Sequence, residues 1–138
     1  MHFLVVEDDE DHAELILHVL AQHAAGHTSH LVTDGEAAWA YMERLKVDRT
    51  LPWPDLILLD IKLPKVDGLE VLAHIKRDDV LGSIPVVVLT TSDAEVDRTK
   101  AYHAHANSYV VKPINFDRFE ALIEELSTYW GKWNHGPK

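Results

Sequence analysis

The sequence contains no cysteine in its 138 residues, which excludes disulfide bonds and thiolate metal sites. Long apolar runs are also missing, because the longest, such as 56–59 and 86–89, are far below the roughly 18 residues that a membrane span needs. Met1 is followed by a short apolar run and then by acidic residues, which is not the pattern of a signal peptide. We therefore expect a cytoplasmic protein.

Positive charge is scarce, since 13 Lys and Arg residues stand against 23 Asp and Glu residues and the formal net charge is -10. Such a charge repels phosphate backbones and anionic lipid, which argues against nucleic acid and membrane as partners. It suits a site that takes a divalent cation. The composition, 46% hydrophobic and 26% charged, is typical of a folded globular chain. We find no internal repeat, low-complexity tract or linker, so a single domain is expected.

Short apolar runs alternate with longer segments of helical period. The runs are rich in Val, Ile and Leu and mostly continuous, which predicts strands buried on both faces of a parallel sheet at 2–6, 28–32, 55–59, 85–89 and 108–111. The segments between and after them predict helices at 9–23, 35–46, 68–77, 94–105 and 115–129. Five alternations of strand and helix indicate a doubly wound α/β fold with right-handed crossovers.

Three segments have individual features. The helix at 115–129 places Phe116, Phe119, Leu122, Ile123 and Leu126 on one face. The helix at 94–105 has only a thin apolar stripe, built on Val96 and small alanines, so we expect it to be weakly anchored and able to shift or to meet a partner. The stretch VDRTLPWP at 47–54 contains two prolines and predicts a rigid loop.

Polar residues follow the predicted strands at their carboxyl ends, where open α/β sheets have their functional crevice. They come from segments far apart in the sequence and are expected to converge: Glu7, Asp8, Asp9, Asp60, Thr90, Thr91 and Lys112. Carboxylates from two strand ends can share a Mg²⁺ ion, which favours oxygen ligands. With the charge offset in this way, Asp60 can act as a nucleophile toward phosphorus. Lys112 and the Thr90 hydroxyl can then bind the oxygens of the acyl phosphate.

Four stretches in this order, VVEDD, LLDIKLPKVDG, PVVVLTTS and SYVVKP, resemble the receiver domain of two-component response regulators. The resemblance covers residues 1–127 and implies a flavodoxin-like receiver fold, with a five-stranded parallel sheet of order 2-1-3-4-5 and five helices. Residues 128–138 would form an aromatic tail, with no output domain. The long connection before the third strand and the tail TYWGKW resemble the single-domain regulators that are paired with bacterial phytochrome histidine kinases.

The resemblance also implies a role for each matching residue. Those roles are Mg²⁺ ligands at Glu7, Asp8, Asp60 and the backbone carbonyl of Lys62, phosphoacceptor at Asp60, switch residues at Thr90 and Tyr109, and the family's lysine at Lys112. The bond between Lys112 and Pro113 matches a peptide bond that is cis in these folds, and X-Pro bonds reach cis at modest cost. The positions of Lys62 and Ser92 resemble sites that vary across the family and tune the loss of the phosphoryl group.

The residues of the acidic run EDDED at 7–11 are then assigned two different roles. Glu7 and Asp8 are assigned to the cation, whereas Asp9, Glu10 and Asp11 are assigned to the first turn of a helix, where acidic residues are favoured by the helix dipole. The alternative is that all five are solvated surface charges. In the same way Asp67 is expected to cap the helix that begins at 68, and His103 and His105 are expected to be surface residues.

The resulting hypothesis is a single-domain response regulator that accepts a phosphoryl group on Asp60 from a histidine kinase and catalyses only its own phosphorylation and dephosphorylation. Its face made by 94–105, 108–111 and 115–129 would switch for partner binding and form a homodimer. The aromatic residues Tyr129, Trp130 and Trp133 support a dimer, because such side chains are seldom exposed as a group.

Three alternatives stay open. A Mg²⁺-dependent aspartyl-phosphate phosphohydrolase usually needs a second acid two residues after the nucleophile, where this chain has Lys62. A flavodoxin-like nucleotide binder would have a hydroxyl- and Gly-rich loop after the first strand, where EDDED would repel phosphate. A pseudo-receiver that only binds partners would lack the acceptor or the lysine, and both are present here.

Overall fold

Five parallel strands form one sheet in the order β2-β1-β3-β4-β5, as predicted. The computed structural model describes residues 1–23 and 27–136. Its strands are β1 (His2–Val6), β2 (Thr28–Val32), β3 (Leu56–Leu59), β4 (Val86–Thr90) and β5 (Ser108–Val111). Its helices are α1 (Glu10–His23), α2 (Gly35–Val47), α3 (Gly68–Arg77), α4 (Glu95–His103), α5 (Phe116–Thr128) and a π-helical turn, η1 (Tyr129–Trp133).

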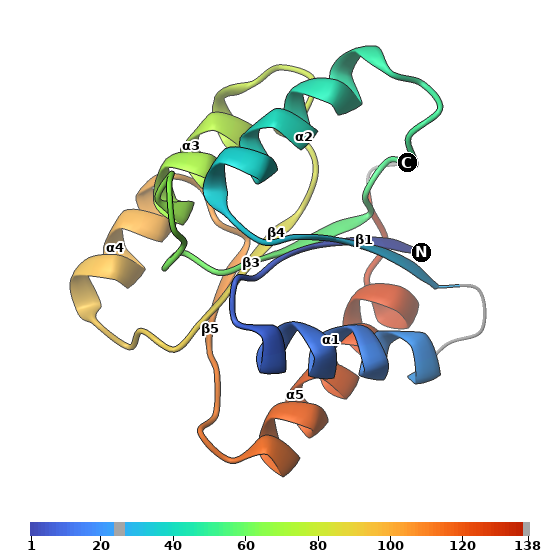
Figure 1. Cartoon of the computed structure of the whole chain (residues 1–138), viewed down its shortest axis with the longest axis vertical. Helices are drawn as coiled ribbons and strands as arrows, with labels where there is room; N and C mark the ends of the chain where they lie inside the picture. The colour runs from blue at the N-terminus through green and yellow to red at the C-terminus, as the bar shows by residue number, and fades with distance from the viewer. Residues whose placement is uncertain (24–26, 137–138) are drawn as a thin grey trace.

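The helices cover both faces of the sheet, with α1 and α5 on one face and α2, α3 and α4 on the other (Figure 1). Strand residues alternate between the two layers of core, because successive side chains of a strand point to opposite faces. Phe3 and Val5 of β1 pack in the core on the α1 and α5 side, whereas Leu4 and Val6 pack in the core on the other side. The continuous apolar runs of the central strands are therefore explained by burial on both faces.

The two edge strands depart from that expectation. In β2 the first three residues are exposed and only Val32 is buried, and in β5 three residues are half-buried while Val111 is exposed. An edge strand has a neighbour on one side only, so its runs of apolar residues are covered less completely than those of β1, β3 and β4. The sequence pattern did not distinguish edge strands from central ones.

The anchoring of α4 differs from the prediction. Val96, on which the apolar stripe was built, is 58% exposed, whereas Asp97 is only 8% exposed and Ala101 is fully buried. Residues 97 and 101 are four apart and share one helix face, and this face packs inward instead of the one that carries Val96. Helix α4 is therefore held by one small apolar residue and one buried carboxylate.

The C-terminal segment is more ordered than a simple tail. Helix α5 ends at Thr128, and the chain continues directly into the η1 turn, where Tyr129 and Trp133 remain exposed. Residues 137–138 of the predicted tail lie outside the described residues. Over the described part of the chain, no helix has the length and apolar character needed to cross a membrane.

The loop between β3 and α3 is tight, because its end at Gly68 lies against its beginning at Asp60 and Ile61. Asp67 caps α3 by accepting a hydrogen bond from the Leu69 N–H, as predicted, and the Gly68 N–H donates to the carbonyl of Ile61. A Cβ atom at Gly68 would lie 2.4 Å from the carbonyl oxygen of Asp60 and 2.4 Å from the Cα of Ile61. Because both atoms belong to the backbone, any larger residue at position 68 would displace the main chain at Asp60.

We therefore expect Gly68→Ala to lower the free energy of unfolding by about 1–3 kcal/mol, since overpacking against a backbone is not relieved by rotamer changes. Urea unfolding at neutral pH measures this change. Gly136→Ala is the matched control, because a Cβ atom at Gly136 has nothing within 4 Å, and its unfolding midpoint should stay at the wild-type value. Equal midpoints for both variants would contradict the steric account.

Candidate functional site

The candidate site lies at the carboxyl ends of the central strands, and the sheet hydrogen bonds continue into it. The Glu7 N–H donates to the carbonyl of Val32 and the Asp60 N–H donates to the carbonyl of Val6, both at 3.0 Å. On the far side, the Lys112 N–H donates to the carbonyl of Thr90 at 2.7 Å. The first residue of each loop is therefore still fixed by the sheet, which gives the side chains there defined positions.

Three carboxylates meet at this edge. Glu7, Asp8 and Asp60 each offer an oxygen atom, and these oxygens lie within 4.8 Å of one another. Glu7 and Asp60 are buried, whereas Asp8 is exposed at the mouth of the site. Three negative groups at this spacing repel one another unless a cation lies among them.

Part of that positive charge comes from Lys112, whose side chain is buried. Its ammonium donates to Asp60 Oδ2 at 2.9 Å, to Glu7 Oε1, and to His12 Nδ1 at 3.0 Å. A lysine ammonium has three donors, so all three are used here. Lys112 therefore links the end of β5 to the loops after β1 and β3.

Lys112 does not fully offset the cost of burying Glu7. The pKa of Glu7 is raised to about 7, and burial of the carboxyl is the largest cause. The charge of Asp60 acts in the same direction, whereas the hydrogen bond and charge of Lys112 act in the opposite direction. A carboxylate in this state gains from an additional cation, because the cation removes the penalty of burying the ionised form.

The donor set fits a divalent metal ion. The three carboxylates carry three negative charges when ionised and Lys112 carries one positive charge, which leaves two negative charges for an ion to balance. All the ligand atoms are carboxylate oxygens, which suits a hard cation such as Mg²⁺ or Mn²⁺. Glu7, Asp8 and Asp60 are the side chains that would hold it.

The main chain of Lys62 lies directly beside the Asp60 carboxylate, because its N–H donates to Asp60 Oδ1 at 2.9 Å. The role of its carbonyl as a metal ligand stays a prediction. The Lys112–Pro113 bond is trans, so the expectation of a cis bond is wrong. Trans is the lower-energy isomer of an X-Pro bond, and Lys112 contacts Asp60 in this arrangement.

The two predicted switch residues converge on Ser92. Thr90 is fully buried at the end of β4, and its hydroxyl accepts a hydrogen bond from the Ser92 N–H at 3.3 Å. Tyr109, on β5, donates its hydroxyl to the Ser92 carbonyl at 2.8 Å, and burial raises the pKa of this phenol. One loop residue therefore connects the threonine and the tyrosine.

Two further residues belong to this region and were missed by the sequence analysis. His12 lies in the first turn of α1, contacts Lys112, and packs edge-on against Phe119 with ring centroids 5.3 Å apart. Asp97, in the first turn of α4, accepts a hydrogen bond from Ser92. The position of His12 in the first turn of a helix that follows the acidic pair was an available signal, but Asp97 resembled an ordinary first-turn acid.

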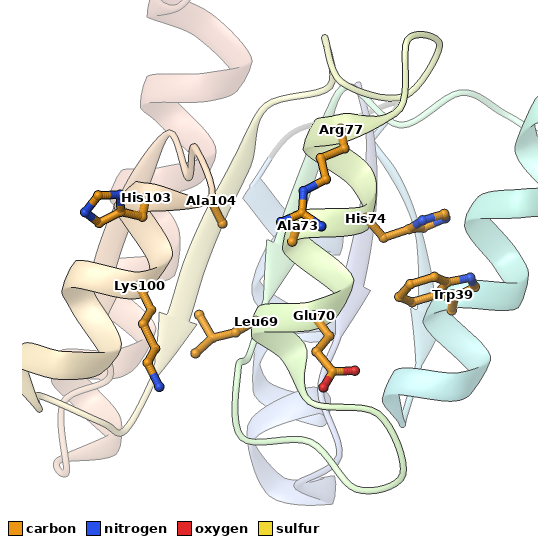
Figure 2. Close-up of a pocket in the computed structure, with 9 residues that line it drawn as sticks. All are labelled: Trp39, Leu69, Glu70, Ala73, His74, Arg77, Lys100, His103 and Ala104. Carbon is orange, nitrogen blue, oxygen red and sulfur yellow. The ribbon is translucent and has the colours of Figure 1, made fainter.

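A groove of about 660 Å³ lies away from the carboxylates, between α2, α3 and α4 (Figure 2). Trp39 of α2 stacks on His74 of α3 with ring centroids 3.8 Å apart, and Lys100 and His103 of α4 line the opposite side. Glu70 is its one acidic lining residue, so the groove lacks the carboxylate cluster and is distinct from the candidate site. His103 and His105 are exposed, as expected.

Comparison with known proteins gives a consistent result. A family model described as the response regulator receiver domain matches residues 3–124. The probable methanogenesis regulatory protein FilR2 from Methanothrix harundinacea is 44% identical over 136 residues, which cover 97% of this chain and 86% of FilR2. The response regulator Rcp1 from Synechocystis is 39% identical over 127 residues, which cover 92% of this chain and 86% of Rcp1.

Solved structures agree with these sequence matches. The phosphorylated cyanobacterial phytochrome response regulator RcpA superposes with a TM-score of 0.93 at 38% identity, covering 99% of this chain and 98% of RcpA. The Mn²⁺-bound form of Rcp1 superposes with a TM-score of 0.92 at 37% identity and covers 99% of both chains. The likeness therefore extends over nearly all of the fold.

The division of the acidic run gives a test of the site. Asp8→Asn should weaken Mg²⁺ or Mn²⁺ binding by about tenfold or more, because a neutral amide replaces an anionic ligand oxygen. Asp11→Asn is the matched control, since Asp11 is a first-turn residue of α1 outside the carboxylate cluster, and its affinity should stay within about twofold of wild type. Isothermal titration calorimetry measures both, and equal effects would show that the division is wrong.

Proposed function

The chain belongs to the response regulator receiver domain family, and we propose that it is a phosphorylation switch with Asp60 as the phosphoacceptor. The observation that carries this proposal is the pairing of Asp60 with the buried Lys112 ammonium, 2.9 Å away, inside a cluster of three carboxylates. Catalysis by the chain is limited to its own phosphorylation and dephosphorylation. Its location is the cytoplasm.

The reaction is a transfer of one phosphoryl group between two side chains. The P–N bond of a phosphohistidine on the kinase breaks while a P–O bond to a carboxylate oxygen of Asp60 forms, and the imidazole leaves as the neutral base or takes a proton from water. Glu7, Asp8, Asp60 and the Lys62 carbonyl would hold Mg²⁺, which would supply positive charge to offset repulsion between the carboxylate and the phosphoryl oxygens.

The residues of this chain then stabilise the acyl phosphate. Lys112 contacts Asp60 in the unphosphorylated protein and is positioned to bind a phosphoryl oxygen. The Thr90 hydroxyl, now an acceptor from Ser92, donates to another phosphoryl oxygen after the loop moves. Because Tyr109 is bonded to the same Ser92, movement of the loop also changes the environment of Tyr109, and the face made by α4, β5 and α5 shifts with it.

The phosphodonor in this proposal is a sensor histidine kinase of the bacteriophytochrome type. The support is that RcpA is described as a phytochrome response regulator, and that two further solved structures of similar fold are described as bacteriophytochrome response regulators. The excess of acidic residues supports a protein partner in preference to nucleic acid.

Incubation with Mg²⁺ and acetyl phosphate should add the mass of one phosphoryl group to the intact protein, as measured by mass spectrometry. Asp60→Asn should show no gain, because an amide oxygen is a poor nucleophile toward phosphorus. Asp67→Asn is the control, since this nearby acid caps α3 and should leave the mass gain unchanged. Absence of a mass gain in the wild-type protein would refute the switch.

We also propose a homodimer through the face of α4, β5 and α5. Large apolar side chains are exposed on this face and on its adjoining loop, namely Val96, Tyr102, Val111 and Ile114. The exposed Tyr129 and Trp133 of η1 add aromatic surface after the end of α5. An exposed group of this size is characteristic of an interaction surface.

Light scattering at high protein concentration should therefore give the mass of a dimer, with or without acetyl phosphate. Val111→Glu places a charge in the middle of the proposed interface and should shift the population to monomer. Val47→Glu is the control, because Val47 is equally apolar and is exposed at the end of α2, outside this face. Monomer alone under all conditions would rule the dimer out.

A further inference from the structure

Asp97 is a buried carboxylate that the phosphorylation chemistry does not use. It is 8% exposed and lies in the first turn of α4, outside the cluster of Glu7, Asp8 and Asp60. One of its oxygens, Oδ2, accepts a hydrogen bond from the Ser92 hydroxyl at 2.6 Å and lies 3.0 Å from the Lys62 ammonium. A buried charge with two such partners is stable in its ionised form.

Its two partners come from the two loops that border the phosphoacceptor. Lys62 is two residues after Asp60, and its backbone N–H is bonded to the Asp60 carboxylate. Ser92 is two residues after Thr90, and its backbone N–H is bonded to the Thr90 hydroxyl. Asp97 therefore contacts a side chain from each loop, while the main chain of each loop contacts a residue of the phosphorylation site.

Two anionic groups near the Lys62 ammonium can attract it. One is Asp97, which it contacts, and the other is the phosphoryl group that Asp60 would carry. The side chain of Lys62 is 57% exposed, so solvent screens its attraction to both groups and a small difference between them decides its position. The hydrogen bond to Asp97 raises the pKa of Lys62, and the bonds from Ser92 and Lys62 lower the pKa of Asp97, so both groups stay charged at neutral pH.

We propose that Asp97 is a positioning residue that holds the Lys62 ammonium away from the phosphoryl group on Asp60 and so weakens the binding of that group at the site. This inference rests on the proposed function of Asp60. It assigns a role to an ion pair that joins α4 to the acceptor loop. The proposed role also explains why an acidic residue occupies the buried face of α4. An apolar residue there would anchor the helix but would not hold the Lys62 ammonium.

The test uses beryllofluoride with Mg²⁺ as an analogue of the phosphoryl group, and calorimetry to measure its dissociation constant. Asp97→Asn keeps an oxygen that can accept from Ser92 but removes the charge that holds Lys62. The expected result is a dissociation constant about twofold to fivefold lower than in the wild type, the range for a partly exposed ion pair. In the Lys62→Met background, Asp97→Asn should change nothing, because no ammonium is left to release.

Two controls separate this role from a structural one. Asp97→Glu restores the carboxylate and should return the dissociation constant toward the wild-type value. Asp78→Asn removes the charge of another ion-paired aspartate, whose partner Lys46 lies 2.6 Å away and which has no contact with the site, and should leave the constant unchanged. An equal change from Asp97→Asn with and without Lys62, or no change in either background, would overturn the proposal.

A measurement on the wild-type protein keeps the test independent of how the variants fold. The Lys62 side-chain NMR resonances should change little when beryllofluoride binds, because the pair with Asp97 persists. A shift of these resonances as large as that of Lys112 would overturn the proposal. If the wild type does not bind beryllofluoride at all, or Asp60→Asn binds it equally well, the proposed function fails instead, which is a different outcome.

Discussion

The buried ammonium of Lys112 is the interaction on which the rest of the site depends. It contacts Glu7 and Asp60, two acidic side chains that are both removed from water and would otherwise repel each other. Three parallel strands are needed to bring these residues together, because β1, β3 and β5 each deliver one of them at its carboxyl end. Removal of the lysine would leave two buried carboxylates without a counter-charge, which is among the most destabilising changes a core can undergo.

The same arrangement suits the site to binding and releasing charged groups. Lys112 offsets only part of the cost of burying these carboxylates, and the pKa of Glu7 is raised chiefly by its burial. In the proposed function a cation and a phosphoryl group bind here together, each favoured by the presence of the other. The tight approach of Gly68 to the Asp60 backbone keeps the acceptor in place while these charges change.

Away from Asp60, the structure holds the loop after β4 and helix α4 by few and polar contacts. Ser92 links Thr90, Tyr109 and Asp97, and α4 has one small apolar residue and one carboxylate on its buried face. Polar contacts of this kind can be exchanged for others at small net cost, whereas a fully apolar interface would resist displacement. The weak anchoring of α4 stays a prediction, and Val96, on which its apolar stripe was expected to be built, is exposed.

Much of the fold and of the candidate site could be predicted from the sequence alone. The continuous apolar runs and the helical segments between them determined the parallel α/β class, because hydrophobic period is a local property. The positions of Glu7, Asp8, Asp60, Thr90 and Lys112 at strand ends followed from the same local pattern, since parallel strands place their carboxyl ends at one edge. Only the tertiary structure decided which helix face of α4 is buried, how completely the edge strands are covered, and that His12 and Asp97 join the site. Those outcomes depend on contacts between residues distant in the sequence, such as Lys62 with Asp97 and His12 with Lys112. The local hydrophobic period of the sequence does not predict such contacts.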